Sequence, residues 1–205
     1  MEAISNQQSA ISFTTFIWLV VGYLSGSTPT GYWIGKLKGI DLTEIGSGST
    51  GATNVLRNLG MWPALLTLVI DVLKGFLPAY FALKLQSNDL IVVLVGIACL
   101  IGHSKSIFLP DFKGGKSSAV GLGILIAISW QAAAITFAIW VVVVGISKYS
   151  SLGSIISVPL TPLWIFLFHR PMIYVWLCII AAIYIVLIRH RENIQRLIKR
   201  IEPKI

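Results

Sequence analysis

The stretch "AVGLGILIAISWQAAAITFAIWVVVVGIS", residues 119–147, contains no charged residue over its whole length, and the number of helices that it forms sets the topology of the chain. A helix that spans a bilayer needs about 20 mostly apolar residues, so this stretch is long for one helix and short for two. The segment "ISWQAA", residues 128–133, is suited to a tight turn. One long helix and two short helices both remain open on hydropathy alone.

The composition of the 205 residues indicates a membrane protein with one domain, residues 1–205. Charged residues make up 12% and hydrophobic residues 56% of the chain, whereas an ordinary soluble domain has about 25% charged residues. The net charge of +8 does not indicate a nucleic-acid partner, because the basic residues lie between long apolar runs, as they do in cytoplasmic loops. Both cysteines lie inside apolar runs and predict no disulfide framework.

Five further apolar runs predict membrane spans at about residues 13–36, 61–83, 90–109, 152–168 and 172–188. The distribution of basic residues decides how many spans the stretch 119–147 forms. With two spans there, seven in total, and the N-terminus outside, thirteen of the sixteen basic residues lie on one side. A single span would divide the basic residues between the two sides. The positive-inside rule therefore predicts an all-α protein with seven transmembrane helices, an outer N-terminus and a cytoplasmic C-terminus.

The first predicted cytoplasmic loop, "DLTEIGSGSTGATNVLRNLG" at residues 41–60, has the composition of an anion site. Its glycines let the backbone approach a ligand and turn N–H groups toward it. The segment "GATN" is expected to start a helix that carries Arg57, which would direct helix-end N–H groups at an anion. A flexible linker would need neither Asn54 nor Arg57, so we favour the anion site.

The second loop contains "PDFKGGKSSAVG", residues 110–121, which resembles the end of a nucleotide-binding P-loop. Pro110 occupies the position of the required glycine, and a spanning helix rather than a strand precedes it. The P-loop reading therefore fails. Lys113 and Lys116 flank two glycines, and lysine is a mobile point charge suited to phosphate.

The remaining cytoplasmic segments add serine, histidine and asparagine. Ser151 and Ser154 lie near a predicted helix start, where capping alone would explain one of them. The tail "RHRENIQRLIKRIEPKI", residues 189–205, has the apolar spacing of an amphipathic helix on the membrane surface. His190 and Asn193 are three residues apart and share one face of it. His190 could act as an acid, as a base or as a hydrogen-bond donor to phosphate.

Asp71 and Lys74 are ionisable residues inside the second predicted span. Such residues are candidates for a functional role, but three residues apart on a helix they can also pair with each other. Both interpretations stay open. The sequence contains no metal-ligand cluster and no catalytic-triad signature, so we expect no cofactor. The ligand is expected to be an anion, most simply a phosphate ester.

At "GSGSTGATNVLR", "GHSKSIFLPDFKGGK" and "HRENIQRLIKRIE" the sequence resembles the bacterial acyl-phosphate:glycerol-3-phosphate acyltransferases of the PlsY type. The resemblance implies an enzyme of the bacterial inner membrane whose active site faces the cytoplasm. In this family the sn-1 hydroxyl of glycerol 3-phosphate attacks an acyl phosphate. The products are lysophosphatidic acid and phosphate, in the first step of phospholipid synthesis, and no metal or other cofactor is required.

The resemblance also implies roles for individual residues. Those expected to be catalytic are His190, Asn193 and Ser47. Those expected to bind substrate are Gly46, Gly48, Asn54, Arg57, His103, Lys113, Gly114, Gly115, Lys116 and Ser151. Structural roles are expected for Glu202 by resemblance, and for Asp71 and Lys74 from their spacing. The chain departs from the family at Thr43, where an arginine is usual, and at Ser117, where a glycine is usual.

Two questions about the mechanism stay open at this point. The proton of the attacking hydroxyl could go to His190 or to the acyl phosphate itself. Asn193, Ser47 or a loop N–H could stabilise the negative charge on the carbonyl oxygen. The main alternative function is a transporter of a phosphorylated metabolite, which predicts polar residues throughout the spans and inverted repeats. The polar residues instead gather at one face, and because one bundle holds all the motifs we expect a monomer.

Overall fold

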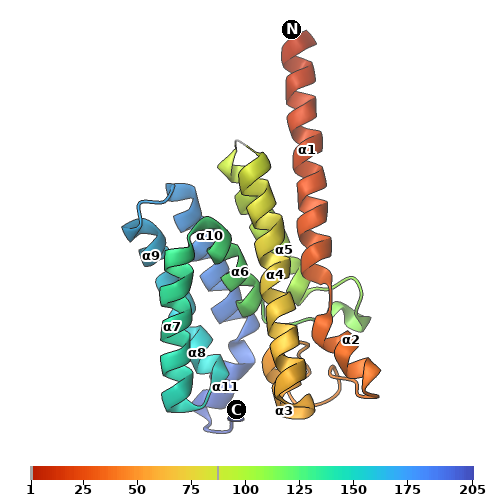
Figure 1. Cartoon of the computed structure of the whole chain (residues 1–205), viewed down its shortest axis with the longest axis vertical. Helices are drawn as coiled ribbons and strands as arrows, with labels where there is room; N and C mark the ends of the chain where they lie inside the picture. The colour runs from red at the N-terminus through yellow and green to blue at the C-terminus, as the bar shows by residue number, and fades with distance from the viewer. Residues whose placement is uncertain (1, 87) are drawn as a thin grey trace.

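The computed structural model describes residues 2–86 and 88–205, with side chains from residue 13 onward. All regular structure in these residues is helical (Figure 1), which confirms the all-α prediction. The α-helices are α1 (Glu2–Ser27), α2 (Thr30–Leu37), α3 (Ala52–Leu59), α4 (Met61–Leu85), α5 (Asp89–Ser104), α6 (Ser118–Ile128), α7 (Trp130–Ser147), α8 (Ser150–Ser157), α9 (Thr161–Leu167), α10 (Met172–Ala182) and α11 (Arg191–Ile198). Shorter elements are the 3-10 turns η1 (Pro110–Phe112) and η2 (Val158–Leu160) and the π-helical segment η3 (Ile183–Arg189).

The stretch 119–147 forms two helices, as the segment "ISWQAA" suggested. The break is at Ser129, whose backbone is extended, with φ −162° and ψ 96°. The Ser129 Oγ atom accepts a hydrogen bond of 3.4 Å from the backbone N–H of Ala132 and so caps α7. Since α6 has 11 residues, it is only about 16 Å long at 1.5 Å per residue.

Four helical segments in the described part of the chain are long and apolar enough to cross a bilayer. They are Met61–Leu85, Trp130–Ser147, Ser150–Leu167 and Met172–Arg189, whereas α5 and α6 are shorter apolar helices. Large apolar side chains are exposed on the outside of the bundle, among them Val69, Leu73, Val141 and Val142. An apolar exterior of this extent indicates contact with lipid.

Small residues let the helices of the bundle approach each other closely. A Cβ atom at Gly26 of α1 would overlap the backbone of Cys99 in α5, and one at Gly123 of α6 would overlap the backbone carbonyl of Val72 in α4. Glycine at such positions is typical of helix packing in membranes. The pairs α1–α5 and α4–α6 are accordingly the most closely packed in the fold.

Several predicted spans differ in detail from the observed helices, and the run 152–168, for example, is formed by α8, η2 and α9. The run 13–36 is broken at Thr28 and Pro29 into α1 and α2. The run 90–109 ends as a helix at Ser104, five residues early, because the following loop folds back onto the end of α5. There the backbone N–H of Gly114 donates to the Ser104 carbonyl at 3.2 Å.

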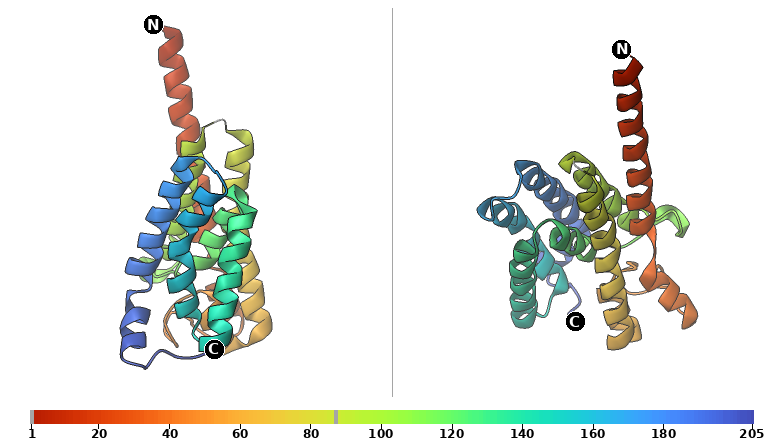
Figure 2. Two further views of the ribbon diagram at one scale, coloured as in Figure 1. Left: turned by 90° about the vertical axis from the view of Figure 1, so that its left-hand side faces the viewer. Right: turned by 45° about the horizontal axis from the view of Figure 1, so that its top comes forward.

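The loops that carry the sequence motifs gather at one end of the bundle. The N-terminal part of α1 projects from the opposite end, and the C-terminus lies near α3 and the lower end of α7 (Figures 1 and 2). This arrangement brings segments that are far apart in the sequence into one region, where a large cavity lies.

Candidate functional site

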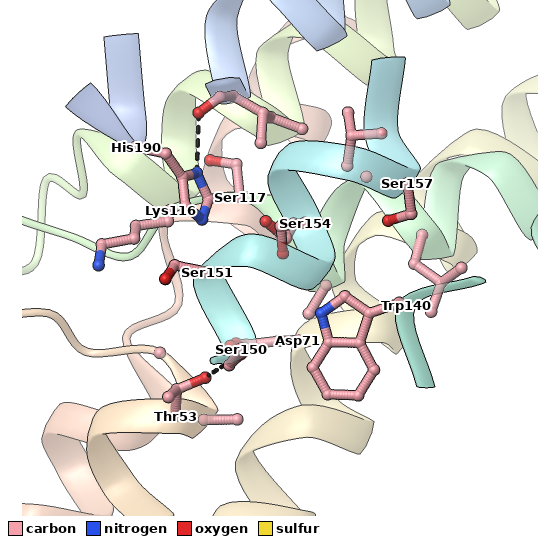
Figure 3. A pocket seen from close by; sticks show the side chains of 18 of the residues that line it. Thr53, Asp71, Lys116, Ser117, Trp140, Ser150, Ser151, Ser154, Ser157 and His190 are labelled. Carbon is pink, nitrogen blue, oxygen red and sulfur yellow. Dashed lines mark hydrogen bonds between the residues drawn. The ribbon is translucent and has the colours of Figure 1, made fainter. Parts of the chain in front are cut away.

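A cavity at this end of the bundle takes side chains from all the predicted cytoplasmic segments (Figure 3). Its empty volume is about 1370 Å³, including part of its open mouth. Residues from the loops and the tail make one part polar. The other part lies between α6, α7 and α10 and is lined mainly by apolar side chains such as Leu125, Phe137 and Leu177. A ligand in this cavity would therefore meet a polar end and an apolar end.

The first glycine-rich loop is organised by Asn54, which is 2% exposed. Its Nδ2 group donates to the backbone carbonyls of Leu42, Ile45 and Ser49 at 3.2, 3.2 and 2.9 Å, and its Oδ1 atom accepts from the backbone N–H of Ser47 at 3.1 Å. Asn54 lines the cavity, but these contacts occupy its amide. Its observed role is to shape the loop that places Ser47 and Ser49 in the cavity wall.

The two predicted glycines of this loop, Gly46 and Gly48, have φ angles of 60° and 63°. This left-handed backbone conformation favours glycine. At Gly46 a Cβ atom would in addition overlap the side-chain oxygen of Asn54. Neither glycine lines the cavity itself, so both act on the site through the shape of the loop.

Helix α3 begins after Gly51, as predicted, and places Thr53 and Arg57 in the cavity wall. The Arg57 side chain is held from behind by the C-terminal segment, residues 199–205. Its Nη2 atom donates to the Pro203 carbonyl at 2.6 Å and its Nε atom to the Lys204 carbonyl at 3.3 Å. These contacts restrict the rotamers of a long side chain and so pre-organise its charge.

The second loop folds onto His103, a buried residue near the end of α5. The backbone N–H of Gly115 donates to the His103 carbonyl at 2.9 Å. A Cβ atom at Gly114 would overlap the His103 backbone, and one at Gly115 would overlap the His103 imidazole. The glycines therefore allow a close approach that no other residue would permit, and they position Lys116 rather than line the cavity.

Lys116 lines the cavity, whereas Lys113 is exposed and does not. Burial, reinforced by the positive charges of Arg196 and Arg57, lowers the pKa of Lys116 to about 8. Of the two lysines that the sequence offered as phosphate ligands, the fold brings only Lys116 to the site. Ser117 adopts a φ of 65°, which explains why a glycine suits this position, and its Oγ atom donates to the Leu100 carbonyl at 2.9 Å.

His190 lies at the end of the π-helical segment η3, and it is 3% exposed. Its Nδ1 atom lies 2.9 Å from the Ile185 carbonyl, which also accepts the backbone N–H of His190 at 3.0 Å. Burial lowers the pKa of His190 to about 4, and the nearby Lys116 charge adds to this. The ring is thus neutral near pH 7. π-Helical turns occur frequently at functional sites.

Glu202 joins three side chains from α8 and α11. Its Oε1 atom accepts from Asn193 Nδ2 at 2.6 Å and from Ser151 Oγ at 2.8 Å, and its Oε2 atom accepts from Arg196 Nε at 2.7 Å. Burial raises the pKa of this carboxyl, but the hydrogen bonds from these three donors lower it by more. Glu202 is therefore ionised, and it fixes the orientation of two predicted site residues.

The Asn193 side chain presents an acceptor rather than a donor. Because a carboxylate only accepts, the Nδ2 group must face Glu202. The Oδ1 atom is buried and has no hydrogen-bond partner among the described residues. A buried acceptor without a partner is uncommon in proteins, and this atom is available to accept a hydrogen bond.

One face of α8 adds polar residues that the sequence analysis did not assign. Ser150 Oγ lies 2.9 Å from Thr53 Oγ1, and the hydroxyls of Ser154 and Ser157 face the same cavity (Figure 3). The spacing of serines at 150, 154 and 157 is the helical period and was the available signal. Another missed residue is Arg189, whose Nη2 atom donates to the Gly115 carbonyl at 3.0 Å.

Asp71 and Lys74 form an ion pair of 2.8 Å, as one of the two interpretations predicted. Asp71 also reaches the cavity wall (Figure 3). Thr43 does not line the cavity. Its backbone N–H donates to Asp41 Oδ1 at 2.9 Å, and the same carboxylate pairs with Lys36 at 2.8 Å.

The site is therefore suited to a phosphate ester with an apolar chain. Two cationic side chains, Arg57 and Lys116, and several hydroxyls surround its polar end. Among the described residues no group of three or more His, Cys, Asp or Glu side chains is arranged to hold a metal ion. The described groups supply anion binding, a neutral imidazole and a free amide oxygen.

Comparison with known proteins gives one consistent family. Residues 16–200 match a family model described as glycerol-3-phosphate acyltransferase. A glycerol-3-phosphate acyltransferase from Nostoc sp. is 45% identical, over 91% of this chain and 90% of the relative. One from Prochlorococcus marinus is 46% identical, over 91% of this chain and 95% of the relative.

Two solved structures are also similar, and both are of PlsY (YgiH), an integral membrane glycerol 3-phosphate acyltransferase. The glycerol 3-phosphate form is 36% identical, with a TM-score of 0.89 over 94% of this chain and 96% of that chain. The lysophosphatidic acid form is 36% identical, with a TM-score of 0.84 over 93% of this chain and 95% of that chain.

Proposed function

Because this chain belongs to the glycerol-3-phosphate acyltransferase family, we propose that it transfers a fatty acyl group from acyl phosphate to the sn-1 hydroxyl of glycerol 3-phosphate. The products are lysophosphatidic acid and inorganic phosphate, in the first step of phospholipid synthesis. The supporting observation is one cavity that joins Arg57, Lys116 and a neutral His190 to an apolar compartment.

The cationic side chains at the polar end of the cavity bind phosphate. Each of the two substrates brings one phosphate group to the site. Lys116 and Arg57 offset this negative charge, since opposite charges interact strongly in a partly desolvated cavity. The hydroxyl of Ser47 adds a hydrogen bond, whereas the Ser151 O–H is directed at the Glu202 carboxylate. Lys113 has no part in this binding because it lies outside the cavity.

The acceptors of the site orient the nucleophile. With Nδ1–H directed at the Ile185 carbonyl, the neutral ring of His190 has its lone pair on Nε2. This lone pair and the free Oδ1 atom of Asn193 receive hydrogens from the hydroxyls of glycerol 3-phosphate. The sn-1 oxygen is thereby held for attack on the acyl carbonyl carbon.

In the reaction the sn-1 oxygen forms a bond to the carbonyl carbon, and the bond from that carbon to the phosphate oxygen breaks. Phosphate leaves, and the hydroxyl proton passes to His190 or to the leaving phosphate. Negative charge on the carbonyl oxygen is stabilised by Ser47 or by N–H groups of the first loop, an effect worth about 3 kcal/mol for each donor.

The acyl chain lies in the apolar part of the cavity. Leu68, Leu122 and Phe137 line this part and also a second, apolar groove between α4, α6 and α7. The groove adjoins the cavity, and other residues of the groove, such as Val69 and Leu73, are exposed on the outside of the bundle. An acyl phosphate dissolved in the bilayer can therefore enter from the side, and lysophosphatidic acid can leave by the same path.

The same proposal includes the topology. Seven spans, an outer N-terminus, a cytoplasmic C-terminus and a location in the bacterial inner membrane are supported by the thirteen basic residues on the side of the site loops. The opposite positions of the two chain ends also support it (Figure 1). The catalytic unit is one chain in one domain, since a single cavity receives every motif.

The direct test is an assay of purified protein in lipid nanodiscs with palmitoyl phosphate and glycerol 3-phosphate. We expect phosphate release that requires glycerol 3-phosphate, with lysophosphatidic acid formed in equal amount. The matched control omits glycerol 3-phosphate. Uptake of labelled glycerol 3-phosphate by sealed proteoliposomes, without acyl transfer, would support the transporter alternative and overturn the enzyme proposal.

A further inference from the structure

We propose that the buried Asp71–Lys74 pair is a positioning element for the substrate site. It holds the break between α1 and α2 in place, and through α2 it holds the first glycine-rich loop, which lines the cavity. This inference rests on the proposed function, in which that loop contacts the substrates. It explains why two ionisable side chains are retained inside a spanning helix.

Mutual pairing does not by itself account for the burial of these two ionisable residues. Asp71 is 2% and Lys74 is 6% exposed, and they lie one turn apart on α4 at 2.8 Å. Removing two charges from water costs about as much as, or more than, their attraction returns. The other contacts of the pair are therefore needed to explain its presence inside the helix.

Lys74 also contacts the break between α1 and α2. Its Nζ atom donates to the Thr28 carbonyl at 2.6 Å, and its own carbonyl accepts from Ser25 Oγ at 2.9 Å. Thr28 directly follows the last residue of α1, and its carbonyl also accepts from the backbone N–H of Thr30 at 3.1 Å. A cation near a helix C-terminus is favourable. Pro29 follows and has no N–H group of its own to offer. Lys74 therefore fixes the point at which the chain leaves α1.

A close contact between α2 and the first glycine-rich loop links the break to the cavity. Gly31, one residue into α2, lies against the backbone of Thr50, where a Cβ atom would overlap the Thr50 carbonyl and lie 2.9 Å from Val55 Cγ2. Thr50 stands between Ser49 and Gly51, which both line the cavity. Because this contact leaves no free space, a displacement of α2 is passed on to the loop.

The position of Asp71 makes the two partners unequal. Asp71 reaches the cavity wall, where the substrates bring phosphate. Loss of Lys74 both frees the helix break and leaves a carboxylate without its partner beside an anionic ligand. Loss of the Asp71 charge leaves the contact from Lys74 to Thr28 intact. The Lys74 variant should therefore be affected more than the Asp71 variant.

The test compares Lys74→Met, Asp71→Asn and Lys74→Arg in nanodiscs. We expect Lys74→Met to raise the KM for glycerol 3-phosphate by about tenfold or more, since a displacement of about 1 Å can cost about 100-fold in catalysis. Asp71→Asn should have a smaller effect, and Lys74→Arg should restore the KM to within about threefold because it keeps a cation at Thr28.

The matched control is Tyr174→Phe, which removes a hydrogen bond of 2.6 Å from Tyr174 to Asp89, two residues that do not line the cavity. It should lower the Tm without changing the KM. If Lys74→Met only lowers the Tm, as the control does, the pair is purely structural and the proposal is wrong. If Lys74→Met does not fold, Gly31→Ala tests the same connection at its next link.

A second readout separates this inference from the proposed function. Hydrogen–deuterium exchange of the amides in residues 46–51 should rise by about tenfold in Lys74→Met and stay unchanged in Tyr174→Phe, because local opening is governed by local contacts. A wild-type protein without acyl transfer would overturn the proposed function alone. Unchanged exchange in Lys74→Met would overturn the positioning role, whatever the activity.

Discussion

The Nδ1 atom of His190 lies 2.9 Å from the carbonyl oxygen of Ile185, and this contact determines the chemistry that the ring can offer. A carbonyl can only accept, so Nδ1 bears the hydrogen and Nε2 has the lone pair. Burial lowers the pKa of the ring to about 4. The fold thus supplies a neutral imidazole with a fixed tautomer.

The first prediction concerns the pH dependence that this ring imposes. A base must be unprotonated, so kcat/KM should stay constant from about pH 7 to about pH 5 and fall as the pH drops through the pKa of about 4. His190→Ala should reduce kcat by about 100-fold or more, the usual contribution of general-base catalysis. If His190→Ala retains the wild-type kcat and only the KM rises, His190 binds substrate and is not the base.

The second prediction distinguishes the two lysines of the second loop. Lys116, with a pKa of about 8, loses its charge as the pH rises through that value, so kcat/KM for glycerol 3-phosphate should fall there. Lys116→Arg should move this fall to higher pH, because a guanidinium stays protonated. Lys113→Gln is the matched control for Lys116→Gln, and it should leave the KM unchanged. Equal effects of the two glutamine variants would contradict the assignment.

The third prediction concerns Glu202, whose carboxylate accepts from Ser151, Asn193 and Arg196. Glu202→Gln replaces an acceptor oxygen by a donor group and should lower the free energy of unfolding by about 2 kcal/mol, as for one lost hydrogen bond to a charged group. It should also lower kcat, because Asn193 loses its orientation. Glu192→Gln, on the exposed side of the same region, should change neither quantity.

The pH dependence of stability tests the same carboxylate. Its folded pKa is lowered from the ordinary value of 4.5, so the folded state holds its proton less tightly than the unfolded state does. The stabilisation is therefore present above that ordinary pKa and is lost as the pH falls through the lowered pKa. Glu202→Gln should remove this acid-side loss from a plot of Tm against pH, and an unchanged plot would contradict it.

The fourth prediction concerns the C-terminal segment. Deletion of residues 203–205 removes the carbonyls of Pro203 and Lys204 that hold Arg57. The guanidinium then has to be ordered when phosphate binds, which should raise the KM for glycerol 3-phosphate by about tenfold while kcat changes less. Ile205→Ala keeps all the backbone contacts, including the bond of 2.9 Å from the Ile205 N–H to the Lys148 carbonyl, and should behave like wild type. A deletion variant with an unchanged KM would exclude this role.

The fifth prediction concerns the packing of Gly115 on His103. In Gly115→Ala the new Cβ atom would overlap the imidazole, so the loop or the ring must move, and Lys116 moves with it. We expect a loss of kcat/KM of about 100-fold, as for other displacements near 1 Å. Gly145→Ala is the control, because no atom lies within 4 Å of its Cβ position and alanine favours the helix. Full activity in Gly115→Ala would show that the close approach is dispensable.

Local patterns in the sequence predict the helical class, the membrane setting and the loops that contain the site. Hydropathy and charge are properties of local stretches, and they determine how a stretch partitions into and orients in the bilayer in any fold. For this reason the break within 119–147 was predictable, and the start of α3 at Ala52 was predictable from the local segment "GATN". The early end of the helix at Ser104 was not, because it depends on contacts with a later loop.

Which side chains meet depends on the tertiary structure. Lys113 and Lys116 have similar sequence surroundings, but Lys113 points outward and Lys116 points into the cavity. This difference arises from the positive φ angles at Asp111 and Phe112 and from the packing of the glycines on His103. Glu202 reaches Ser151 across 51 residues of chain, and no local pattern encodes such a contact. Hydropathy acts on each segment separately, whereas side-chain direction depends on backbone angles and on neighbours from distant segments.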